Sequence, residues 1–456
     1  MCTDGIEDTL PAGLARPLIA DNALRLLLIA YEFPPSPSPQ SLRWQYLARE
    51  LVALGVEVHV LTAENWWPST STSVPPGVVL HRTWPGGTAG LVALSRRWRR
   101  LRGSGRPAPV AAPAMPAHGG AGEALNWKGR VLERLNRLVA RFTFPDERGR
   151  WEPSARRKLR ELLDTLHPDV VISSHEPATT LRLGRIAKQR GFLWVADLGD
   201  PVLSFYTPAR WQDESRELER WTCRNADCVT VTTEAAKQML ATRHEVPESR
   251  FAVLTQGYDS CTGPRREVGV EFERDRLELL YTGRFYRFRE PRALVDAVLA
   301  APHVRLTIAT SRAPEWLLPL VDEHPDRLRL LGFVPHAEAV LLQRAADVLV
   351  NIANEDPVHV PGKVYEYLGA GRPILHLGGG GDDEAARLVR HHGRGLVTGN
   401  DAGSIGAALA ELVSVKREGS WDERFSLGQD GVEQYQWRSI AKRLHGLLGE
   451  VVGAYR

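Results

Sequence analysis

The chain has 456 residues, more than one ordinary domain holds, so we expect at least two domains, each with its own core. Its composition, 43% hydrophobic and 25% charged, is typical of a soluble globular protein and excludes wholesale disorder, a coiled-coil fibre and a collagen-like fold. The formal net charge of +3 is close to balance, which argues against a protein that binds nucleic acid along its whole surface.

The cysteines and the N-terminus favour a cytoplasmic protein. Four cysteines are too few for a disulfide framework in a chain of this length. Cys223 and Cys228 have no second pair and no histidine cluster nearby, so we expect reduced packing cysteines rather than a zinc site. No apolar run precedes Leu24, so the N-terminus does not resemble a signal peptide, and no stretch reaches the about 18 apolar residues of a membrane span. If the protein meets a membrane, we expect it to lie on the surface.

From Leu24 onward, short apolar runs alternate with longer amphipathic ones, a pattern typical of parallel strands joined by crossover helices. We predict strands at residues 25–31, 57–63, 169–175, 192–198, 228–233 and 251–256, and helices at 41–54, 178–190 and 214–225. The strands are rich in Val, Ile and Leu on both faces, which is typical of buried parallel strands.

One basic stretch, residues 96–160, interrupts this alternation. It holds seventeen Lys or Arg against five acidic residues, a net of about +12 that leaves about −9 for the rest of the chain. Within it, fifteen of the twenty residues 103–122 are Gly, Pro or Ala, which predicts a mobile insertion. Residues 127–142 have the pattern of a basic amphipathic helix, suited to an anionic membrane surface or acceptor. An ordinary packing helix with a solvated face explains that pattern equally well.

After the irregular residues 257–268 the alternation starts again. Strands are predicted at 277–282, 304–310, 328–331, 348–352, 374–377 and 395–397, and helices at 291–299, 340–345, 363–368, 383–389 and 404–413. The chain is therefore predicted to be α/β, with two Rossmann-like, doubly wound parallel sheets and a ligand cleft between them. We place a tail at 1–23, one domain at 24–265 with the basic insertion at about 96–150, a second at 266–430, and a C-terminal helix at 431–456 that packs back toward the first domain.

The loop after the first strand, residues 31–41, carries the first candidate contacts. It runs directly into a predicted helix, whose free N-terminal N–H groups suit a phosphate or a sugar hydroxyl. Pro35, Ser38 and Gln40 are the candidate acceptor contacts there, although a proline-rich surface turn explains the same letters. No G-x-G-x-x-G occurs, which disfavours a dinucleotide-binding domain.

The loop after the first strand of the second half, residues 280–290, contains Gly283, Arg284 and Arg289. Two guanidiniums in one loop can clamp a diphosphate through paired, charge-assisted hydrogen bonds. Arg287 is a third candidate, and an ordinary basic loop is the alternative.

A third segment, residues 360–374, predicts a phosphate site and a ribose site one helical turn apart. A helix begins after Pro361 and Gly362, so its N-terminal amides, with Lys363 beside them, can hold phosphate. Glu366, one turn further along, can accept hydrogen bonds from two ribose hydroxyls. That spacing is about the separation of phosphate and ribose in a nucleotide.

These segments resemble the GT-B glycosyltransferases of the large retaining group called glycosyltransferase family 4 (group 1). The resemblance covers nearly the whole chain, and its most specific part is VPGKVYEYLGAGRPIL, similar to a variant found in sugar transferases of cell-envelope polysaccharide pathways. FPDERGRW, PDVVISSH and VADLGDP follow one branch of the group in order, and YQWRSIAKRL closes the match.

The resemblance implies roles for the second half. Arg284 corresponds to the arginine that binds the donor diphosphate, and Arg289 stands where the family has lysine. Glu366 corresponds to the second glutamate of the E-x7-E pair, which binds ribose, whereas the first glutamate falls at Val358 and is missing. Glu355 or Asp356 can replace it by a local shift. Residues 332–335, with Val334, match the loop that contacts the base.

The resemblance also implies roles for the first half. His175 lies where related enzymes place a histidine near the transferred sugar, and Asp197 and Asp200 are candidates for holding acceptor hydroxyls. Alternatively, His175 belongs to the core or to a turn, and Asp197 caps a turn. The family's diglycine in the first loop is absent and is replaced by residues 36–41, which leaves the acceptor geometry open.

The implied function is retaining transfer of a sugar from a nucleotide-diphosphate sugar, with no metal and no other cofactor. The acceptor is expected to be a lipid-linked or other cell-envelope glycan at the inner face of the membrane, an expectation that rests on the basic segment 127–142. Two alternatives stay open: a small soluble acceptor, as in secondary metabolism, and a GT-B protein that binds nucleotide sugar without transferring it. Nucleotide-sugar epimerases and phosphorylases share the fold. No nucleic-acid partner is expected.

Overall fold

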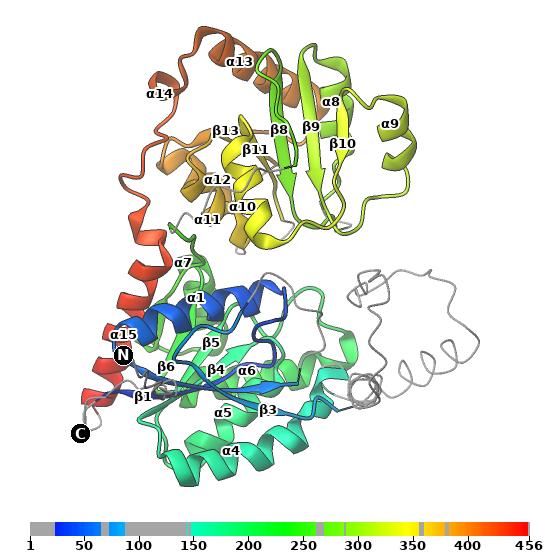
Figure 1. Ribbon diagram of the computed structural model, residues 1–456. Coiled ribbons are helices and arrows are strands. Elements are labelled where there is room, and N and C mark those ends of the chain that lie inside the picture. Colours follow the sequence, from blue (N-terminus) through cyan, green and yellow to red (C-terminus); the bar gives the residue numbers. More distant parts are fainter. Residues whose placement is uncertain are drawn as a thin grey trace, which may run out of the picture.

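The computed structural model describes residues 23–64, 73–86, 144, 147–260, 269–286, 289–354, 360–378 and 383–454. Within these residues the strands form two parallel sheets, each covered by helices, in two domains that lie one above the other in Figure 1. The predicted α/β architecture of two doubly wound sheets is confirmed. Among the described helices, none is both long and apolar enough to cross a membrane.

The N-terminal sheet has seven strands in the order β3-β2-β1-β4-β5-β6-β7, all parallel. Its strands are β1 (Arg25–Ile29), β2 (Glu57–Ala63), β3 (Val79–Thr83), β4 (Val170–His175), β5 (Trp194–Leu198), β6 (Cys228–Val231) and β7 (Phe251–Val253). The helices of this half are α1 (Pro39–Ala53), α4 (Glu152–Leu166), α5 (Thr179–Gln189), α6 (Gln212–Asn225) and α7 (Glu234–His244), with short 3-10 turns at Glu147–Trp151, Ala209–Trp211 and Glu248–Arg250.

The C-terminal sheet has six parallel strands in the order β10-β9-β8-β11-β12-β13. They are β8 (Leu277–Thr282), β9 (Val304–Ala309), β10 (Leu328–Leu330), β11 (Val348–Ile352), β12 (Ile374–Leu377) and β13 (Gly395–Thr398). The helices are α8 (Arg292–Ala300), α9 (Leu317–Glu323), α10 (His336–Ala345), α11 (Gly362–Ala370), α12 (Glu384–His391), α13 (Ala402–Glu418), α14 (Trp421–Arg424) and α15 (Trp437–Gly453), with a 3-10 turn at Glu433–Tyr435.

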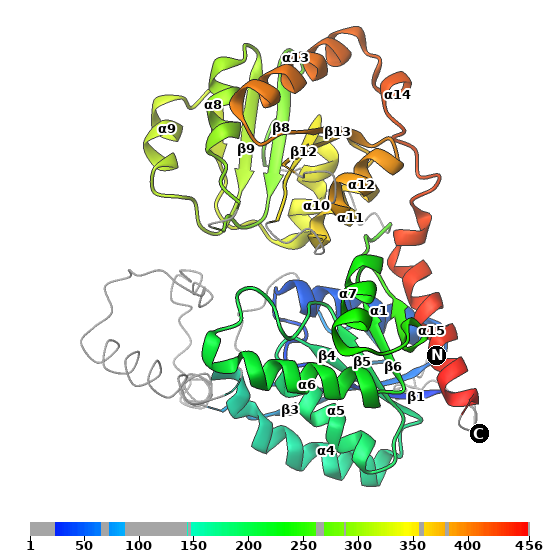
Figure 2. The ribbon, with the colours of Figure 1, turned by 180° about the vertical axis from the view of Figure 1, so that it is seen from behind.

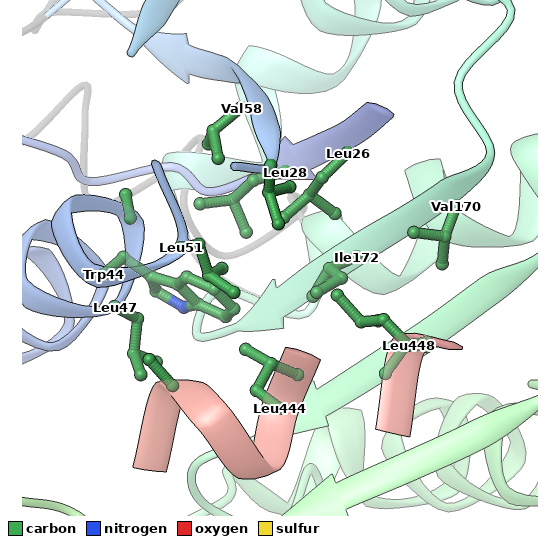
Figure 3. Packing of buried hydrophobic residues seen from close by; sticks show 14 of the residues in the cluster. Leu26, Leu28, Trp44, Leu47, Leu51, Val58, Val170, Ile172, Leu444 and Leu448 are labelled. Carbon is green, nitrogen blue, oxygen red and sulfur yellow. The ribbon is translucent and has the colours of Figure 1, made fainter. Parts of the chain in front are cut away.

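The last helix, α15, leaves the C-terminal domain and runs alongside the N-terminal one, as both views show (Figures 1 and 2). Its apolar side completes a core of the first sheet, because Leu444 packs with Trp44 of α1 and with Leu26 and Leu28 of β1 (Figure 3). The intervening residues of β1 face the opposite core, under α4 and α5. The alternation of side chains along one strand therefore buries both faces of the sheet.

Every predicted strand is present, with its ends shifted by at most three residues, and each predicted helix is present, some of them longer. The prediction omitted β3, α4, α7, α9 and α14. Strand β3 lies at the sheet edge and has no fully buried residue, so no apolar run marks it.

Residues 103–122 and 127–142 lie outside the described residues, so the insertion and its basic helix stay predictions.

Helix α4 lies at the end of the basic stretch, where the dense positive charge obscures its apolar spacing. Two of its four cations are paired within the helix: Arg156 bonds Glu152, and the Lys158 ammonium lies 2.6 Å from Glu161. The described part of the basic stretch is therefore partly neutralised.

Cys223 and Cys228 are free and buried, as expected. Burial raises the pKa of the Cys223 thiol to about 12 and that of Cys228 to about 11, so both thiols stay protonated and unreactive at neutral pH.

Two chain segments cross side by side between the domains. Tyr258, in the segment that leaves β7, donates its backbone N–H to Tyr435 O at 3.0 Å, and its carbonyl accepts from Trp437 N at 3.0 Å. The Tyr258 hydroxyl donates to Gln429 Oε1 at 2.8 Å, and the ring lies against Gly369 of α11. The linker and the returning chain are thus joined to each other and to helix α11.

We predict that Gly369→Ala destabilises the protein by about 2 kcal/mol, because a Cβ at this position lies 2.2 Å from the Tyr258 ring and forces overpacking. Thermal denaturation measures the effect as a lower midpoint. Gly406→Ala in α13 is the matched control, since its Cβ meets nothing within 4 Å and alanine is the better helix former. Equal midpoints for the two variants would contradict the packing argument.

Candidate active site

The order of strands places the site in each sheet. Parallel sheets bind ligands beyond the carboxyl ends of their strands, at the point where the strand order reverses. In the N-terminal sheet this point lies between β1 and β4, and in the C-terminal sheet between β8 and β11. The loops predicted from the sequence, after β1, β4, β8 and β11, flank these two points.

The first loop connects β1 to α1, and the start of α1 is hydrogen-bonded to the end of β4. Ser38 caps α1 by accepting a hydrogen bond from Ser41 N at 3.1 Å. The next residue but one, Gln40, donates its amide to the Ser174 hydroxyl and, at 2.9 Å, to the carbonyl of His175. Pro35 lies in the same loop, after a cis Pro34–Pro35 bond. Gln40 therefore lies beside His175, as one site at this sheet edge requires.

His175, the last residue of β4, is 5% exposed, and its Nδ1 lies 2.9 Å from the carbonyl oxygen of Asp200. A carbonyl only accepts, so Nδ1 carries the proton and a neutral ring leaves Nε2 as an acceptor. Asp200 thus meets His175 through its main chain, and this contact fixes the orientation of the ring.

Asp197, predicted to bind the acceptor, lies inside the domain at 2% exposure. Its carboxylate accepts hydrogen bonds from Ser174 Oγ at 3.0 Å, Thr230 Oγ1 at 2.8 Å and Arg43 at 3.2 Å. A buried carboxylate with three protein donors is suited to positioning its neighbours rather than to contacting a sugar hydroxyl. The structure therefore favours a positioning role for Asp197.

Arg43, which the sequence analysis missed, is the buried partner of Asp197 at 1% exposure. Its guanidinium also donates to Leu254 O at 3.0 Å and to Thr255 O at 2.8 Å. These carbonyls follow β7 and begin the interdomain linker, so one side chain ties α1 to the linker. An arginine one residue before the buried Trp44 of α1 was the available signal, because a buried charge requires a partner.

In the C-terminal domain, Gly283 follows β8 with φ +128° and is exposed. A Cβ there would lie 3.8 Å from Lys363 Nζ, so the absence of a side chain leaves Lys363 open at this point. Arg284 comes next and is partly exposed, and its carbonyl accepts from the Tyr281 hydroxyl at 2.9 Å. The Tyr281 hydroxyl thus holds the carbonyl of Arg284 in place, while the Arg284 side chain is partly exposed to solvent.

Arg289 is 8% exposed and turns toward the end of β11. Its Nε donates to Asn354 Oδ1 at 2.8 Å, and its guanidinium lies 5.4 Å from the centre of the Tyr286 ring. Asn354 is a further contact that the sequence analysis missed. Glu355, Asp356 and Val358 lie outside the described residues, so a substitute for the missing glutamate stays a prediction, as does Arg287.

Lys363 lies at the N-terminus of α11, with Nζ 3.9 Å above the centre of the Tyr281 ring and 3.4 Å from Thr282 O. Burial and the charge of Arg289 hold its pKa well below the ordinary value, although Glu366 opposes this. An anion bound beside Lys363 would favour the charged ammonium. The site is therefore matched to a ligand that brings negative charge.

Glu366, one turn along α11, is held from α10. His336 Nε2 lies 2.8 Å from Oε1, and Gln343 Nε2 donates to Oε2 at 3.2 Å. Burial alone would raise the pKa of Glu366, but the charge of His336 and the hydrogen bonds from His336 and Gln343 outweigh it and lower that pKa. Burial disfavours the charged form of His336, yet the charge and hydrogen bond of Glu366 outweigh it and raise the pKa of His336, so the pairing favours the charged form of both groups.

His336 and Gln343 were also missed, since a histidine and a glutamine on a short helix carry no spacing signal of their own. The expected base-contact loop directly precedes His336: Val334 packs against the C-terminal core, and Gly332 turns with φ +70°. The structure therefore brings together Gly283, Lys363 and Glu366 with the loop that contains Val334.

Comparisons with known proteins bear on the sequence pattern and on the fold. The sequence pattern described as Glycosyltransferase Family 4 matches residues 110–260. A comparison with curated proteins finds no match.

Three solved structures share the fold. Sucrose-phosphate synthase from Thermosynechococcus elongatus is 18% identical with a TM-score of 0.63, covering 94% of this chain and 100% of its own. HepE from Anabaena, solved with UDP-glucose, is 14% identical with a TM-score of 0.57, covering 94% and 100%. WaaG, described as a glycosyltransferase involved in lipopolysaccharide biosynthesis, is 13% identical with a TM-score of 0.56, covering 93% and 99%.

The shared fold and the match over residues 110–260 agree with the resemblance stated from the motifs: the chain has the GT-B fold, and its N-terminal half is similar to Glycosyltransferase Family 4.

Proposed function

We propose that the protein is a retaining glycosyltransferase that uses a nucleotide-diphosphate sugar. The observation that carries this proposal is α11, which presents Lys363 at its N-terminus and Glu366 one turn later, both partly exposed. A diphosphate beside Lys363 and a ribose beside Glu366 match the two ends of a nucleotide diphosphate. HepE, which shares the fold, is described as a complex with UDP-glucose, which supports a donor of this class.

In this proposal the protein stabilises the negative charge of the departing diphosphate. Arg284, Arg289 and Lys363 supply positive charge, and the amides at the N-terminus of α11 supply partial charge, so no divalent metal is needed. The departing phosphate oxygen takes the proton of the acceptor hydroxyl on the same face of the sugar. No protein nucleophile is required.

The acceptor side then positions the transferred sugar and the acceptor. His175, oriented by the Asp200 carbonyl, lies with Gln40 at the β1–β4 switch point. The ring presents Nε2 as an acceptor for a sugar hydroxyl. In this proposal the two domains close over the bound donor and exclude water, which would otherwise hydrolyse it.

For the acceptor we propose a lipid-linked or envelope glycan, encountered by a cytoplasmic protein at the inner face of the membrane. The basic residues 127–142 support this, and so does the fold shared with WaaG. A soluble acceptor is the second candidate, because sucrose-phosphate synthase, by its name a maker of a sugar phosphate, shares the fold.

We predict that a nucleotide sugar raises the thermal midpoint of the protein, because a ligand that binds only the folded state stabilises it according to its concentration over Kd. A thermal-shift panel that starts with UDP-glucose identifies the donor.

We predict that Arg284→Ala lowers turnover with that donor at least about a hundredfold, since it removes charge that stabilises the leaving group. Arg424→Ala, on exposed α14, is the control and should leave turnover unchanged.

An unchanged rate in Arg284→Ala would contradict the role of that arginine. A shift with a nucleotide sugar but neither hydrolysis nor transfer across a broad acceptor panel would favour the third reading, a protein that binds donor without transferring it.

We predict salt-sensitive sedimentation of the protein with vesicles of anionic phosphatidylglycerol but not with neutral phosphatidylcholine vesicles, because the basic residues 127–142 are attracted to anionic lipid. Reversing Arg130, Arg134 and Arg137 to Glu should abolish the binding. Full turnover on a soluble acceptor with no lipid binding would favour the soluble alternative.

A further inference from the structure

The carboxylate of Glu366 has both oxygens fixed by α10, one by His336 and the other by Gln343. Each carboxylate oxygen has two lone pairs, so each keeps one acceptor position for a ligand. The Glu366 side chain is 24% exposed and that of His336 is 19% exposed, so a ligand can reach both. His336 therefore sets the direction in which Glu366 offers its remaining acceptor positions.

The other side of His336 faces the N-terminal domain. Its ring lies 6.2 Å from the ring of Tyr46, centre to centre, and Tyr46 comes from α1. Tyr46 in turn stacks on Trp437 of α15 at 5.7 Å with the rings nearly parallel. The ring that touches His336 is thus fixed by the packed layer of α1 and α15.

A second link joins α10 to α1, through Asp259 of the linker. Arg49, one turn after Tyr46, makes a bidentate pair with the Asp259 carboxylate at 2.9 and 3.0 Å. Arg344, near the far end of α10, donates to the Asp259 carbonyl at 3.2 Å. Helix α10 is therefore tied to α1 near both of its ends, directly at His336 and through the linker at Arg344.

We propose that His336 is a positioning residue for the nucleotide ribose: it orients the Glu366 carboxylate toward the ribose hydroxyls and, through Tyr46, makes that orientation depend on the arrangement of the two domains. This inference rests on the proposed function, because it takes a ribose at Glu366. A pre-oriented carboxylate binds two hydroxyls without the cost of ordering itself, and that cost appears in donor affinity rather than in the chemical step.

Calorimetric titration with UDP, GDP and ADP measures the effect without requiring transfer. His336→Phe keeps a ring next to Tyr46 but cannot donate to Glu366, and it should weaken the Kd of the tightest diphosphate about tenfold. His336→Gln retains an N–H donor and should restore affinity to within about threefold of the parent protein. Circular dichroism confirms that each variant is folded.

The decisive probe is the 2′,3′-dideoxy form of the same diphosphate, which lacks the hydroxyls that Glu366 would accept. The loss caused by His336→Phe should disappear with this ligand. An equal loss for both ligands, or no loss for either, overturns the ribose role. If the parent protein binds none of the three diphosphates, the proposed function itself fails.

A double-mutant cycle tests the link to the other domain. Tyr46→Leu should weaken diphosphate binding about threefold in the parent protein but not in His336→Phe, because the effect passes through His336. An equal effect in both backgrounds overturns the coupling while leaving the ribose role intact.

Discussion

The buried ion pair between Arg43 and Asp197 is the interaction on which the switch-point edge of the N-terminal sheet depends. Taking two charges out of water is costly, and the attraction between them offsets that cost only when their remaining polar atoms are also satisfied. Here Ser174 and Thr230 complete the carboxylate, and the carbonyls of residues 254 and 255 accept from the two terminal nitrogens of the guanidinium. Most polar atoms of the pair are thus satisfied, and the Arg43 Nε is buried without a hydrogen-bond partner among the described residues. The pair thereby fixes the ends of β4 and β5, helix α1 and the start of the linker relative to one another.

In the C-terminal domain, two charged side chains that are only partly exposed lie on one helix, α11. Lys363 and Glu366 occupy successive turns of α11, and each is surrounded by residues that modify its charge. Burial and the charge of Arg289 lower the pKa of Lys363, whereas the charge and hydrogen bond of His336 lower the pKa of Glu366. The two side chains, one turn apart, therefore differ in how their surroundings affect the charged form: it is disfavoured for Lys363 and favoured for Glu366.

Much of this architecture could be predicted from the sequence. Buried parallel strands are uninterrupted runs of Val, Ile and Leu, and the strands of both sheets were located from those runs, except for the partly exposed β3. Loops at the carboxyl ends of strands then located Gly283, Lys363 and Glu366. Their partners could not be predicted, because His336, Gln343 and Asn354 act through tertiary contacts between elements that lie far apart in the sequence.

Asp197 is a residue whose position could be predicted from the sequence but whose hydrogen-bond partners could not. Its place at the end of a strand was predicted correctly, but its role depends on whether its oxygens face solvent or Arg43, and an isolated sequence does not contain that information. Position follows from periodicity, whereas the direction of a polar side chain follows from its neighbours.

The return of α15 to the first sheet makes the N-terminal domain discontinuous in sequence. A fragment that stops at the linker would lack Leu444 and Leu448, and the apolar surfaces of Leu26, Leu28 and Trp44 would face water. The two domains therefore cannot be separated by a single cut. A design that exchanges the C-terminal domain between proteins of this fold must splice the chain twice, once on each side of the crossing at Tyr258.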